Sequence, residues 1–242
     1  MVSLFYQIMK QPMDNVVVIR GNIFNSKAQT IVNTVNCVGV MGKGIALVFK
    51  LRYPDLFEKY SELCSQHLIQ PGKLWIYKGA DDAPWVLNFP TKYHWKYPSK
   101  MEYIVAGLEK FLDTYKEKGI TSIAFPLLGT HNGGLDKKEV LEVMNMYLNQ
   151  CSIPVEIYDY RPGDPDDLFE SFKERWNSIP KEDLKSATGI RTKKQIETLD
   201  SAINSPQIQS MISLIDCPGI GLKTMEKCFD LVLHYEPNQQ LI

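Results

Sequence analysis

The sequence has few residues of the kind that build metal sites or disulfide frameworks. Its five cysteines are widely scattered, none of them forms a C-x-x-C pair, and none has a histidine nearby at ligand spacing. This distribution excludes a disulfide scaffold and a zinc motif of the usual spacing. We therefore expect a reduced, cytoplasmic protein with no metal ion and no cofactor.

Long apolar runs and an excess of one charge are also lacking. The sequence contains no run of about 18 apolar residues, the length needed to span a membrane. The N-terminal segment lacks the charged start and the small-residue cleavage site of a secretory signal. The net charge is −1, which excludes bulk electrostatic attraction to nucleic acid, so any such contact must be local. We expect a protein that is neither secreted nor bound to a membrane.

Strand-like and helix-like segments alternate over most of the 242 residues. Short β-branched or apolar runs predict strands, whereas apolar residues at helical spacing predict helices. The predicted strands lie in 15–24, 30–36, 72–79, 85–90, 120–129 and 154–160, and the predicted helices in 45–67 (interrupted near Pro54), 101–119 and 138–151. This alternation favours an α/β fold with a mostly parallel sheet.

The texture of the sequence changes after Tyr160. Residues 161–180 contain three prolines and an acidic cluster, which favours a linker between a domain at 1–160 and a small helical domain at 181–242. Within the latter, "CPGIGLKTMEKCFDLV" suits a tight hairpin between helices with free backbone N–H groups. An earlier stretch, "ATGIRTKKQIETL", is a weaker echo of it.

The first chemistry-bearing segment is a glycine-rich loop between a predicted strand and a predicted helix. Gly39, Gly42 and Gly44 let backbone N–H groups approach a ligand, and the following helix N-terminus favours negative charge, so a diphosphate is a natural guest. The alternative is a turn that serves only the chain topology. Lys43 precedes Gly44 rather than Ser or Thr, so the loop is not a P-loop.

Two asparagines, Asn33 and Asn36, precede this loop at the end of the strand. Their amides could hydrogen-bond a sugar hydroxyl or could hold the loop itself, and the sequence leaves both roles open.

A second glycine loop, residues 129–135, also follows an apolar strand and precedes a helix. Because ligands bind outside the carboxyl ends of strands in α/β sheets, two such loops could grip one extended, phosphate-rich molecule. Asp136 ends this loop. It also fits a capping box, with Asp136 as N-cap and Glu139 reaching back, which explains the aspartate without chemistry.

The stretch "NFPTKYHW", residues 88–95, places Lys92 after a predicted strand, so we expect it at the same sheet edge as the two glycine loops. A solvated lysine has a pKa near ~10.4 and is a poor nucleophile at neutral pH. Desolvation among Phe89, Tyr93 and Trp95 would lower that pKa and suit Schiff-base chemistry with a sugar aldehyde. Nearby phosphates would favour an anion clamp instead, and the sequence leaves that choice open.

Together, the segments "GNIF", "VNTVNCVGVMGKGIALVFK", "NFPTKYHW" and "GGLD" resemble the macrodomain family, which binds ADP-ribose. They are most similar to the DarG branch, the antitoxin partners of DarT toxins, which attach ADP-ribose to thymidine in single-stranded DNA. The resemblance runs from Val16 to Tyr160. It implies a three-layer α/β/α sandwich with a mixed, mostly parallel sheet, followed here by the small C-terminal helical domain.

The same resemblance implies a DNA ADP-ribosyl glycohydrolase that cleaves the bond between ribose C1″ and the thymine ring. Lys92 matches the branch's essential lysine. In a related hydrolase of the branch the matching lysine attacks C1″, and an aspartate matching Asp136 resolves the covalent intermediate. Lys92 and Asp136 are thus the expected catalytic residues.

The resemblance also implies which residues contact each partner. ADP-ribose would lie against the strand ends and the two glycine loops, at Gly21, Asn22, Ile23, Asn33, Asn36, Val40, Met41, Gly42, Lys43, Gly44, Thr91, Leu128, Gly129, Thr130, His131, Asn132, Gly133, Gly134 and Leu135. ADP-ribosylated single-stranded DNA would contact His94 and Trp95, and the C-terminal hairpin would bind it through Gly219, Gly221, Lys223 and Thr224.

The sequence departs from the family pattern at two positions. Asn22 replaces the aspartate that contacts the adenine amino group in many macrodomains, and Tyr93 stands where a basic residue is expected in this branch. Two other functions therefore compete: a reader that binds ADP-ribose without cleaving it, and an antitoxin that acts mainly through protein contact. A DarT-like toxin is accordingly a further expected partner, of the C-terminal part in particular.

Overall fold

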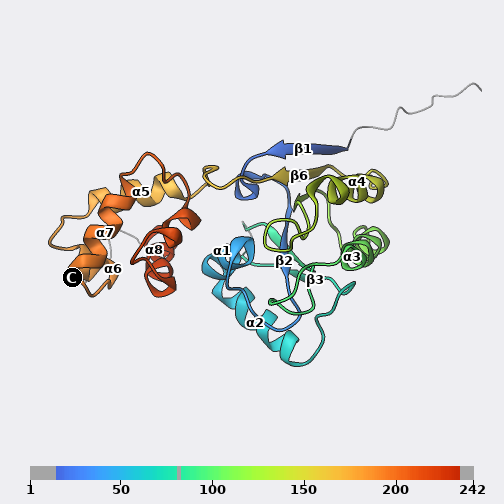
Figure 1. Cartoon of the computed structure of the whole chain (residues 1–242), viewed down its shortest axis with the longest axis horizontal. Coiled ribbons are helices and arrows are strands. Elements are labelled where there is room, and N and C mark those ends of the chain that lie inside the picture. Colours follow the sequence, from blue (N-terminus) through green and yellow to red (C-terminus); the bar gives the residue numbers. More distant parts are fainter. Residues whose placement is uncertain (1–14, 81–82, 235–242) are drawn as a thin grey trace, which may run out of the picture.

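The computed structural model describes residues 15–80 and 83–234. Residues 1–14, considered above for a targeting signal, lie outside the described part, in which no helix is long and apolar enough to cross a membrane. A six-stranded sheet has the order β1-β6-β5-β2-β4-β3 (Figure 1). Its strands are β1 (Val16–Arg20), β2 (Thr30–Val35), β3 (Trp75–Tyr77), β4 (Trp85–Pro90), β5 (Ile123–Pro126) and β6 (Val155–Asp159).

The sheet is mixed and mostly parallel, because only β3 runs antiparallel to its neighbour β4. The strands are nearly continuous apolar runs, as expected for a sheet covered on both faces. Helices α1 (Gly44–Arg52) and α2 (Pro54–Ser65) enclose one apolar core, and α3 (Met101–Thr114) and α4 (Lys137–Leu148) enclose the other. The predicted three-layer α/β/α sandwich is thus confirmed.

The C-terminal part consists of helices. They are α5 (Phe169–Ser178), α6 (Leu184–Thr188), α7 (Lys193–Ile203), the 3-10 helix η2 (Met211–Asp216) and α8 (Leu222–His234). A second 3-10 helix, η1 (Ile23–Asn25), follows β1 in the sandwich. Over the described residues from 181 to 234 there is no strand, in agreement with the predicted helical domain.

The predicted linker over 161–180 differs from the structure, because its second half forms α5. Phe169, Phe172 and Trp176 are buried in the core of the C-terminal helices. They recur at the spacing of a helical face, but the flanking prolines and acidic residues obscured that pattern. The connecting segment is therefore residues 161–168, and α5 belongs to the C-terminal unit.

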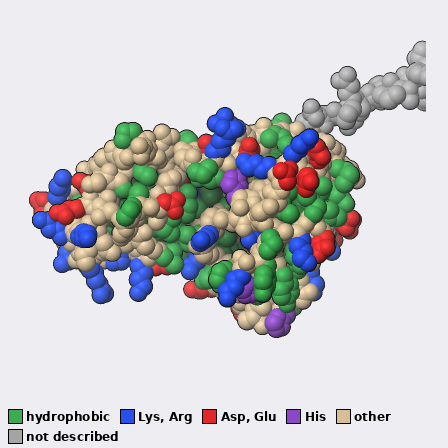
Figure 2. All heavy atoms as spheres, in the orientation of Figure 1, with side chains coloured by type: hydrophobic (Ala, Val, Ile, Leu, Met, Phe, Trp, Pro, Cys, Tyr) green, Lys and Arg blue, Asp and Glu red, His purple; other side chains and the backbone are tan. Residues whose placement is uncertain are grey.

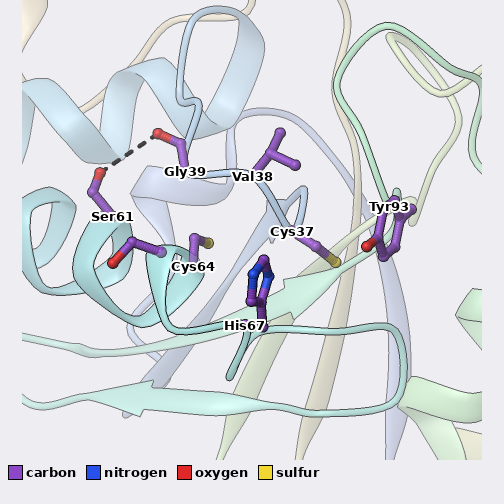
Figure 3. Close-up of a pocket in the computed structure, with 8 residues that line it drawn as sticks. Cys37, Val38, Gly39, Ser61, Cys64, His67 and Tyr93 are labelled. Carbon is purple, nitrogen blue, oxygen red and sulfur yellow. Dashed lines mark hydrogen bonds between the residues drawn. The ribbon is translucent and has the colours of Figure 1, made fainter.

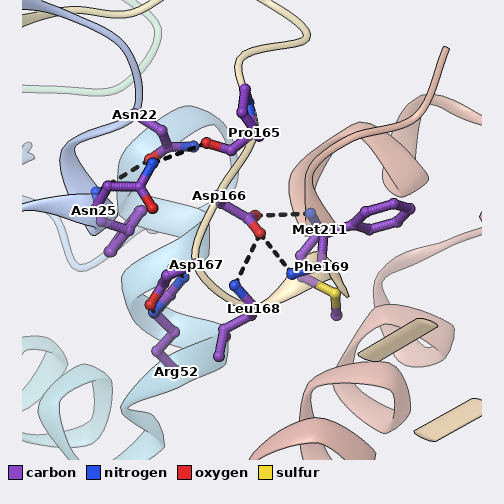
Figure 4. Close-up of polar contacts among 10 residues, drawn as sticks. Asn22, Asn25, Arg52, Pro165, Asp166, Asp167, Leu168, Phe169 and Met211 are labelled. Carbon is purple, nitrogen blue, oxygen red and sulfur yellow. Dashed lines mark hydrogen bonds and ion pairs between the residues drawn. The ribbon is translucent and has the colours of Figure 1, made fainter. Parts of the chain in front are cut away.

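The C-terminal helices pack against α1, the helix that begins at the first glycine loop. Leu47, Val48 and Leu51 of α1 are buried in the same apolar cluster as α5 and α8. Beside them the Arg52 guanidinium donates two hydrogen bonds to the Asp167 carboxylate (Figure 4). The same guanidinium lies over the ring of Phe24, 4.0 Å from its centroid. The position of the C-terminal unit is thus tied to the loop side of the sandwich.

Asp166 fastens the connecting segment to the C-terminal helices. Its buried carboxylate accepts hydrogen bonds from the N–H groups of Leu168 (3.1 Å), Phe169 (2.9 Å) and Met211 (2.7 Å), which joins the start of α5 to η2 (Figure 4). One side chain thus satisfies three backbone donors from two elements that are distant in the sequence.

We expect Asp166→Ala to lower the free energy of unfolding by roughly 2–4 kcal/mol, because buried donors left without an acceptor cost about 1–3 kcal/mol each. Urea denaturation measures this loss. Glu170→Ala removes an exposed carboxylate from the first turn of α5 and should change stability by less than about 0.5 kcal/mol. Equal losses in the two variants would contradict the role assigned to Asp166.

Candidate active site

The carboxyl ends of three neighbouring parallel strands, β4, β2 and β5, bring the predicted site residues to one edge of the sheet. The segment after β4 continues alongside the end of β2. The Thr91 N–H donates to the Val35 carbonyl (3.0 Å), and the Cys37 N–H donates to the Tyr93 carbonyl (3.0 Å). Lys92 is therefore held by backbone bonds between these two contacts, at the predicted edge.

Lys92 joins this segment to the second glycine loop. Its ammonium donates to the backbone carbonyl of Asn132. The side chain is partly buried, and this burial lowers the pKa of Lys92. No carboxylate in the described part of the chain pairs with it, so desolvation acts without an opposing ion pair. This is the direction that a nucleophilic lysine requires.

The second glycine loop is tightly wound. The Gly134 N–H donates to the Thr130 carbonyl (2.6 Å), the Leu135 N–H donates to the Gly129 carbonyl (3.1 Å), and the Ser99 N–H donates to the Gly133 carbonyl (2.9 Å). A Cβ on Gly133 would lie 2.0 Å from the Gly129 carbonyl oxygen, so no other residue fits there. The loop thus has a fixed shape that positions Asn132 for Lys92.

Ser99 is a site neighbour that the sequence analysis did not identify. Its hydroxyl is buried and has no hydrogen-bond partner in the described part of the chain. It lies against the second glycine loop, 3.1 Å from where a Cβ on Gly129 would stand. No pattern in the local sequence indicates that Ser99 belongs to the site, because its position depends on how residues 96–100 fold onto the second glycine loop.

Asp136 is the N-cap of α4, as predicted. Its Oδ1 atom accepts from the N–H groups of Lys138 (2.9 Å) and Glu139 (3.0 Å). Among the described residues, no bond runs from the Glu139 carboxylate back to Asp136, so the capping box is half formed. The Asp136 side chain is exposed, and its Oδ2 atom has no partner in that same part of the chain. The N-cap hydrogen bonds therefore leave Oδ2 of Asp136 available to contact a ligand or a water molecule.

The first glycine loop meets the second at Gly44, the first residue of α1. Gly44 has φ +58°, and a Cβ there would lie 2.7 Å from Nδ2 of Asn132. No side chain caps the start of α1 at Lys43. The unpaired N–H groups of a first helical turn attract anions, so the start of α1 adjoins the loop that Lys92 touches.

The two asparagines at the end of β2 serve the framework. The Asn36 side chain donates to the Val40 carbonyl (2.5 Å) and accepts from the Val38 N–H (3.0 Å), so it holds the loop. Asn33 is fully buried, and its Nδ2 donates to Oδ1 of Asn88 (3.0 Å). Of the two roles left open by the sequence, the structure shows that Asn36 holds the loop.

Asn22, which follows β1, and His131 of the second glycine loop lie at the same edge of the sheet. Asn22 is buried, and its Oδ1 caps η1 by accepting from the Phe24 N–H (3.1 Å). His131 bridges the loop to the end of β6, because its Nε2 contacts the Tyr160 carbonyl (3.1 Å) and its Nδ1 contacts the Thr130 hydroxyl (3.2 Å). Both side chains are therefore already engaged in internal contacts.

The remaining predicted ligand contacts are divided by exposure. The exposed residues among them are Val40, Gly42, Lys43, Asn132 and Gly134. Gly21 and Leu135 are half-buried. The buried residues are Ile23, Met41, Thr91, Leu128, Gly129, Thr130 and Gly133. The exposed residues cluster on the two glycine loops. These loops are therefore the part of the site that an incoming ligand meets first.

The predicted DNA contacts are mostly accessible, with one exception. His94 and Trp95 stack at 5.5 Å between ring centroids, and Gly219, Gly221 and Lys223 are exposed. Thr224, however, is buried, and its hydroxyl accepts from the Gln195 side chain (3.4 Å). Its side chain therefore links α7 to α8 and does not suit direct contact with DNA. Lys and Arg side chains project from the C-terminal unit in Figure 2.

Comparison with known proteins identifies the architecture. The Macro domain family model matches residues 32–144. The solved macrodomain of Mycobacterium tuberculosis DarG superposes with a TM-score of 0.57 at 40% sequence identity, covering 59% of this chain and 96% of that chain. The chain belongs to the DarG branch of the macrodomain family.

Two further relatives support the same assignment. The structure of Thermosipho africanus DarTG in complex with ADP-ribose has a TM-score of 0.58 at 34% identity, covering 72% of this chain and 45% of that chain. The DNA ADP-ribosyl glycohydrolase of Thermus aquaticus is 41% identical over 146 residues, which is 60% of this chain. The chain spans 40% of the length of that relative.

Proposed function

We propose that this macrodomain is a DNA ADP-ribosyl glycohydrolase that removes ADP-ribose from thymidine bases of single-stranded DNA. It would thereby reverse the modification made by a DarT-like toxin, as a cytoplasmic antitoxin and DNA repair enzyme. The observation that carries this proposal is the position of Lys92. Its partly desolvated ammonium, without a carboxylate partner in the described part of the chain, lies where the two glycine loops meet.

The two loops supply the binding site for ADP-ribose. The N-terminus of α1, which no side chain caps, favours the negative charge of the diphosphate. The fixed backbone of residues 129–135 would hold the distal ribose near Lys92. Asn22 retains a second lone pair on Oδ1 for the adenine amino group while it caps η1.

The proposed chemistry starts from the unprotonated form of the Lys92 amine beside C1″, and burial favours this form because it lowers the pKa of Lys92. The Lys92 amine attacks C1″, the C1″–thymine bond breaks, and the thymine ring leaves with the bonding electron pair. The proton that the amine loses restores the neutral thymine. Water then adds to C1″ of the lysyl adduct while Oδ2 of Asp136 accepts one of its protons. Asp136 passes this proton to Nζ as the C1″–Nζ bond breaks, which releases ADP-ribose, neutral Lys92 and the Asp136 carboxylate. Overall, one water is consumed for each ADP-ribose released.

The cap geometry of Asp136 supports its part in the second step. Two backbone N–H groups bind Oδ1, which fixes the orientation of the carboxylate at the start of α4. The oxygen that is free in the described structure is then available as a base for water. Structural and chemical roles coexist on one side chain because they use different oxygens.

The experiment that tests this function is release of ADP-ribose from an ADP-ribosylated thymidine oligonucleotide. Chromatography should show free ADP-ribose and the unmodified oligonucleotide appearing in equal amounts with the wild-type chain. Binding of ADP-ribose, measured by calorimetry in the same preparation, shows that the site is intact. Binding without any release would identify a reader and overturn the proposal.

We infer that the C-terminal unit adds contacts to the DNA backbone through its two helical hairpins. Gly189 and Gly219 both have a left-handed backbone (φ +64° and φ +92°). The hairpins lie side by side around a cavity of about 460 Å³, lined by Thr192, Lys194, Gln195, Thr198, Pro218 and Gly219. The exposed residues Gly219, Gly221 and Lys223 are its proposed contacts. A DarT-like toxin is the competing partner for this unit.

We expect Lys223→Glu to weaken binding of unmodified single-stranded DNA by about three- to tenfold at low salt, and to reduce the salt dependence by about one ion. Fluorescence anisotropy with a labelled oligonucleotide measures both. Lys110→Glu makes the same change of charge on α3 of the sandwich, outside both hairpins, and should have a smaller effect. The same loss in both variants would contradict the assignment to the hairpin and leave the toxin as the partner.

A further inference from the structure

A cavity of about 330 Å³ lies beside the Lys92 segment and has no part in the proposed reaction (Figure 3). Its size falls within the ~300–1,000 Å³ range of small-molecule sites. Three segments form it: the loop after β2, the C-terminal end of α2 with the residues that follow, and Tyr93. The principal lining residues are Cys37, Gly39, Ser61, Cys64, His67 and Tyr93.

The cavity adjoins Lys92 but is separate from its ammonium. The Cys37 N–H donates to the Tyr93 carbonyl (3.0 Å), and Sγ of Cys37 contacts the Lys92 carbonyl (3.3 Å), so the backbone of the Lys92 segment forms one boundary. The Lys92 side chain reaches Asn132 instead, and neither of these side chains lines the cavity. A chemical group bound in the cavity would therefore lie next to the ligand atoms that contact the Lys92 ammonium, but in a separate position.

The walls of the cavity are neutral. Among residues 15–80 and 83–234, no Lys, Arg, Asp or Glu side chain lines it. Burial raises the pKa of the Cys37 thiol to about 12 and also raises that of Cys64, so neither is a thiolate at neutral pH. A phosphate would find no counter-charge there, and a metal ion would find no anionic ligand. The chemistry of the walls suits an uncharged, flat molecule with polar edges.

Two rings at the cavity are available for stacking. Tyr93 is 57% exposed although it follows the buried strand β4 closely. His67 has φ +58°, the left-handed region that non-glycine residues seldom adopt. This conformation turns the chain after α2 so that the ring lies at the cavity, as Figure 3 shows. Strained backbone of this kind is concentrated at functional sites.

The residues after Tyr93 continue the aromatic surface. His94, Trp95 and Tyr97 form an aromatic strip, in which the His94 ring lies 5.5 Å from Trp95 and 5.6 Å from Tyr97. Trp95 and Tyr97 are 49% and 66% exposed, and the Lys96 ammonium lies 5.2 Å from the Trp95 ring. Exposed rings interleaved with a cation are the surface on which single-stranded nucleic acids stack their bases.

We propose that the cavity is a nucleobase subsite, which receives the base of the nucleotide next to the modified thymidine between Tyr93 and His67. The aromatic strip then carries the next base along the strand. This inference rests on the proposed function, since it names how the same site recognises its DNA. It also gives Tyr93 a role: a stacking ring stands where the branch has a basic residue, so base contact replaces a phosphate contact.

The test compares two substrates: ADP-ribosylated thymidine alone, and a pentanucleotide with the ADP-ribosylated thymidine at its centre. The measured quantity is the ratio of kcat/KM for the pentanucleotide to kcat/KM for the mononucleoside. We expect the wild-type ratio to exceed about five, because one stacked base contributes at least that factor. Abasic sites placed on one side of the thymidine and then on the other identify the neighbour that occupies the cavity.

Two variants remove the rings without disturbing the fold. Tyr93→Ala truncates an exposed side chain. His67→Gly removes the imidazole, and glycine adopts the left-handed backbone conformation of this position without strain. Each should lower the ratio at least about fivefold, and Tyr93→Phe, which retains the ring, should restore it. Leu68→Ala is the matched control, because Leu68 is exposed beside His67 but does not line the cavity.

The outcomes separate this inference from the proposed function. A wild-type ratio near one, with both substrates cleaved, would overturn the nucleobase subsite and leave the glycohydrolase intact. A ratio that falls equally in Leu68→Ala and Tyr93→Ala would also overturn it. Cleavage of neither substrate by the wild type would overturn the proposed function itself.

Discussion

Lys92→Ala should abolish the release of ADP-ribose from ADP-ribosylated DNA, with a loss of at least about 10³-fold in kcat. The variant loses the proposed nucleophile, whereas the two glycine loops proposed to hold the diphosphate remain. Affinity for free ADP-ribose should therefore change by less than about tenfold, since only one hydrogen bond to Asn132 is lost. Single-turnover release and calorimetric binding, measured on the same preparation, check both parts.

Lys92→Arg distinguishes a nucleophile from an anion clamp. Arginine keeps the positive charge but stays protonated, so it should bind ADP-ribose and remain as inactive as alanine. Because burial lowers the pKa of Lys92, the wild-type rate should rise with pH as the ammonium loses its proton, and should level off below the pH at which an exposed lysine would titrate. Activity retained in Lys92→Arg would show that the side chain is a clamp.

Gly133→Ala should lower the affinity for ADP-ribose by at least about 100-fold, which is a loss of roughly 3 kcal/mol of binding free energy. The new Cβ would lie 2.0 Å from the Gly129 carbonyl oxygen and 2.4 Å from the Ser99 hydroxyl, so the loop must open. Opening it displaces Asn132, which both Lys92 and Gly44 contact. Isothermal calorimetry with ADP-ribose measures the loss.

Gly134→Ala is the informative comparison, because it adds the same methyl group one residue later. A Cβ there meets nothing within 4 Å, and only the left-handed backbone (φ +79°) is strained, at a cost of about 1–2 kcal/mol. Its loss of affinity should therefore be clearly smaller than that of Gly133→Ala. The reverse order would show that the loop is not held in the shape described here.

The order of elements in the sandwich could be predicted from the sequence because its local patterns agree with the tertiary structure. Apolar runs such as residues 85–90 became buried strands, and Lys92 appeared at the strand edge where it was expected. The N-cap role of Asp136 followed from residue type and position alone. These features depend on neighbours in the chain, which a sequence displays.

Features that depend on distant contacts could not be predicted. Helix α5 was assigned to a linker, because its apolar face is buried in a cluster whose other members come mostly from α1, α6, α7, η2 and α8, elements that its own sequence does not reveal. Thr224 was expected to contact DNA, but it is buried and its hydroxyl accepts a bond from Gln195 on α7. The neutral cavity at Cys37 and His67 combines segments that are separated by a helix in the chain. No local pattern records such contacts.

The most direct measurement of the proposed chemistry is intact-protein mass spectrometry of Asp136→Asn after incubation with ADP-ribosylated oligonucleotide. Asparagine keeps the N-cap of α4, because its side-chain oxygen still accepts from the N–H groups of Lys138 and Glu139. It cannot deprotonate the water that resolves the adduct. We expect a mass increase of one ADP-ribosyl group, located on Lys92 by peptide mapping, with the oligonucleotide released unmodified. Release of ADP-ribose at the wild-type rate, with no adduct on Lys92, would contradict covalent catalysis by this lysine.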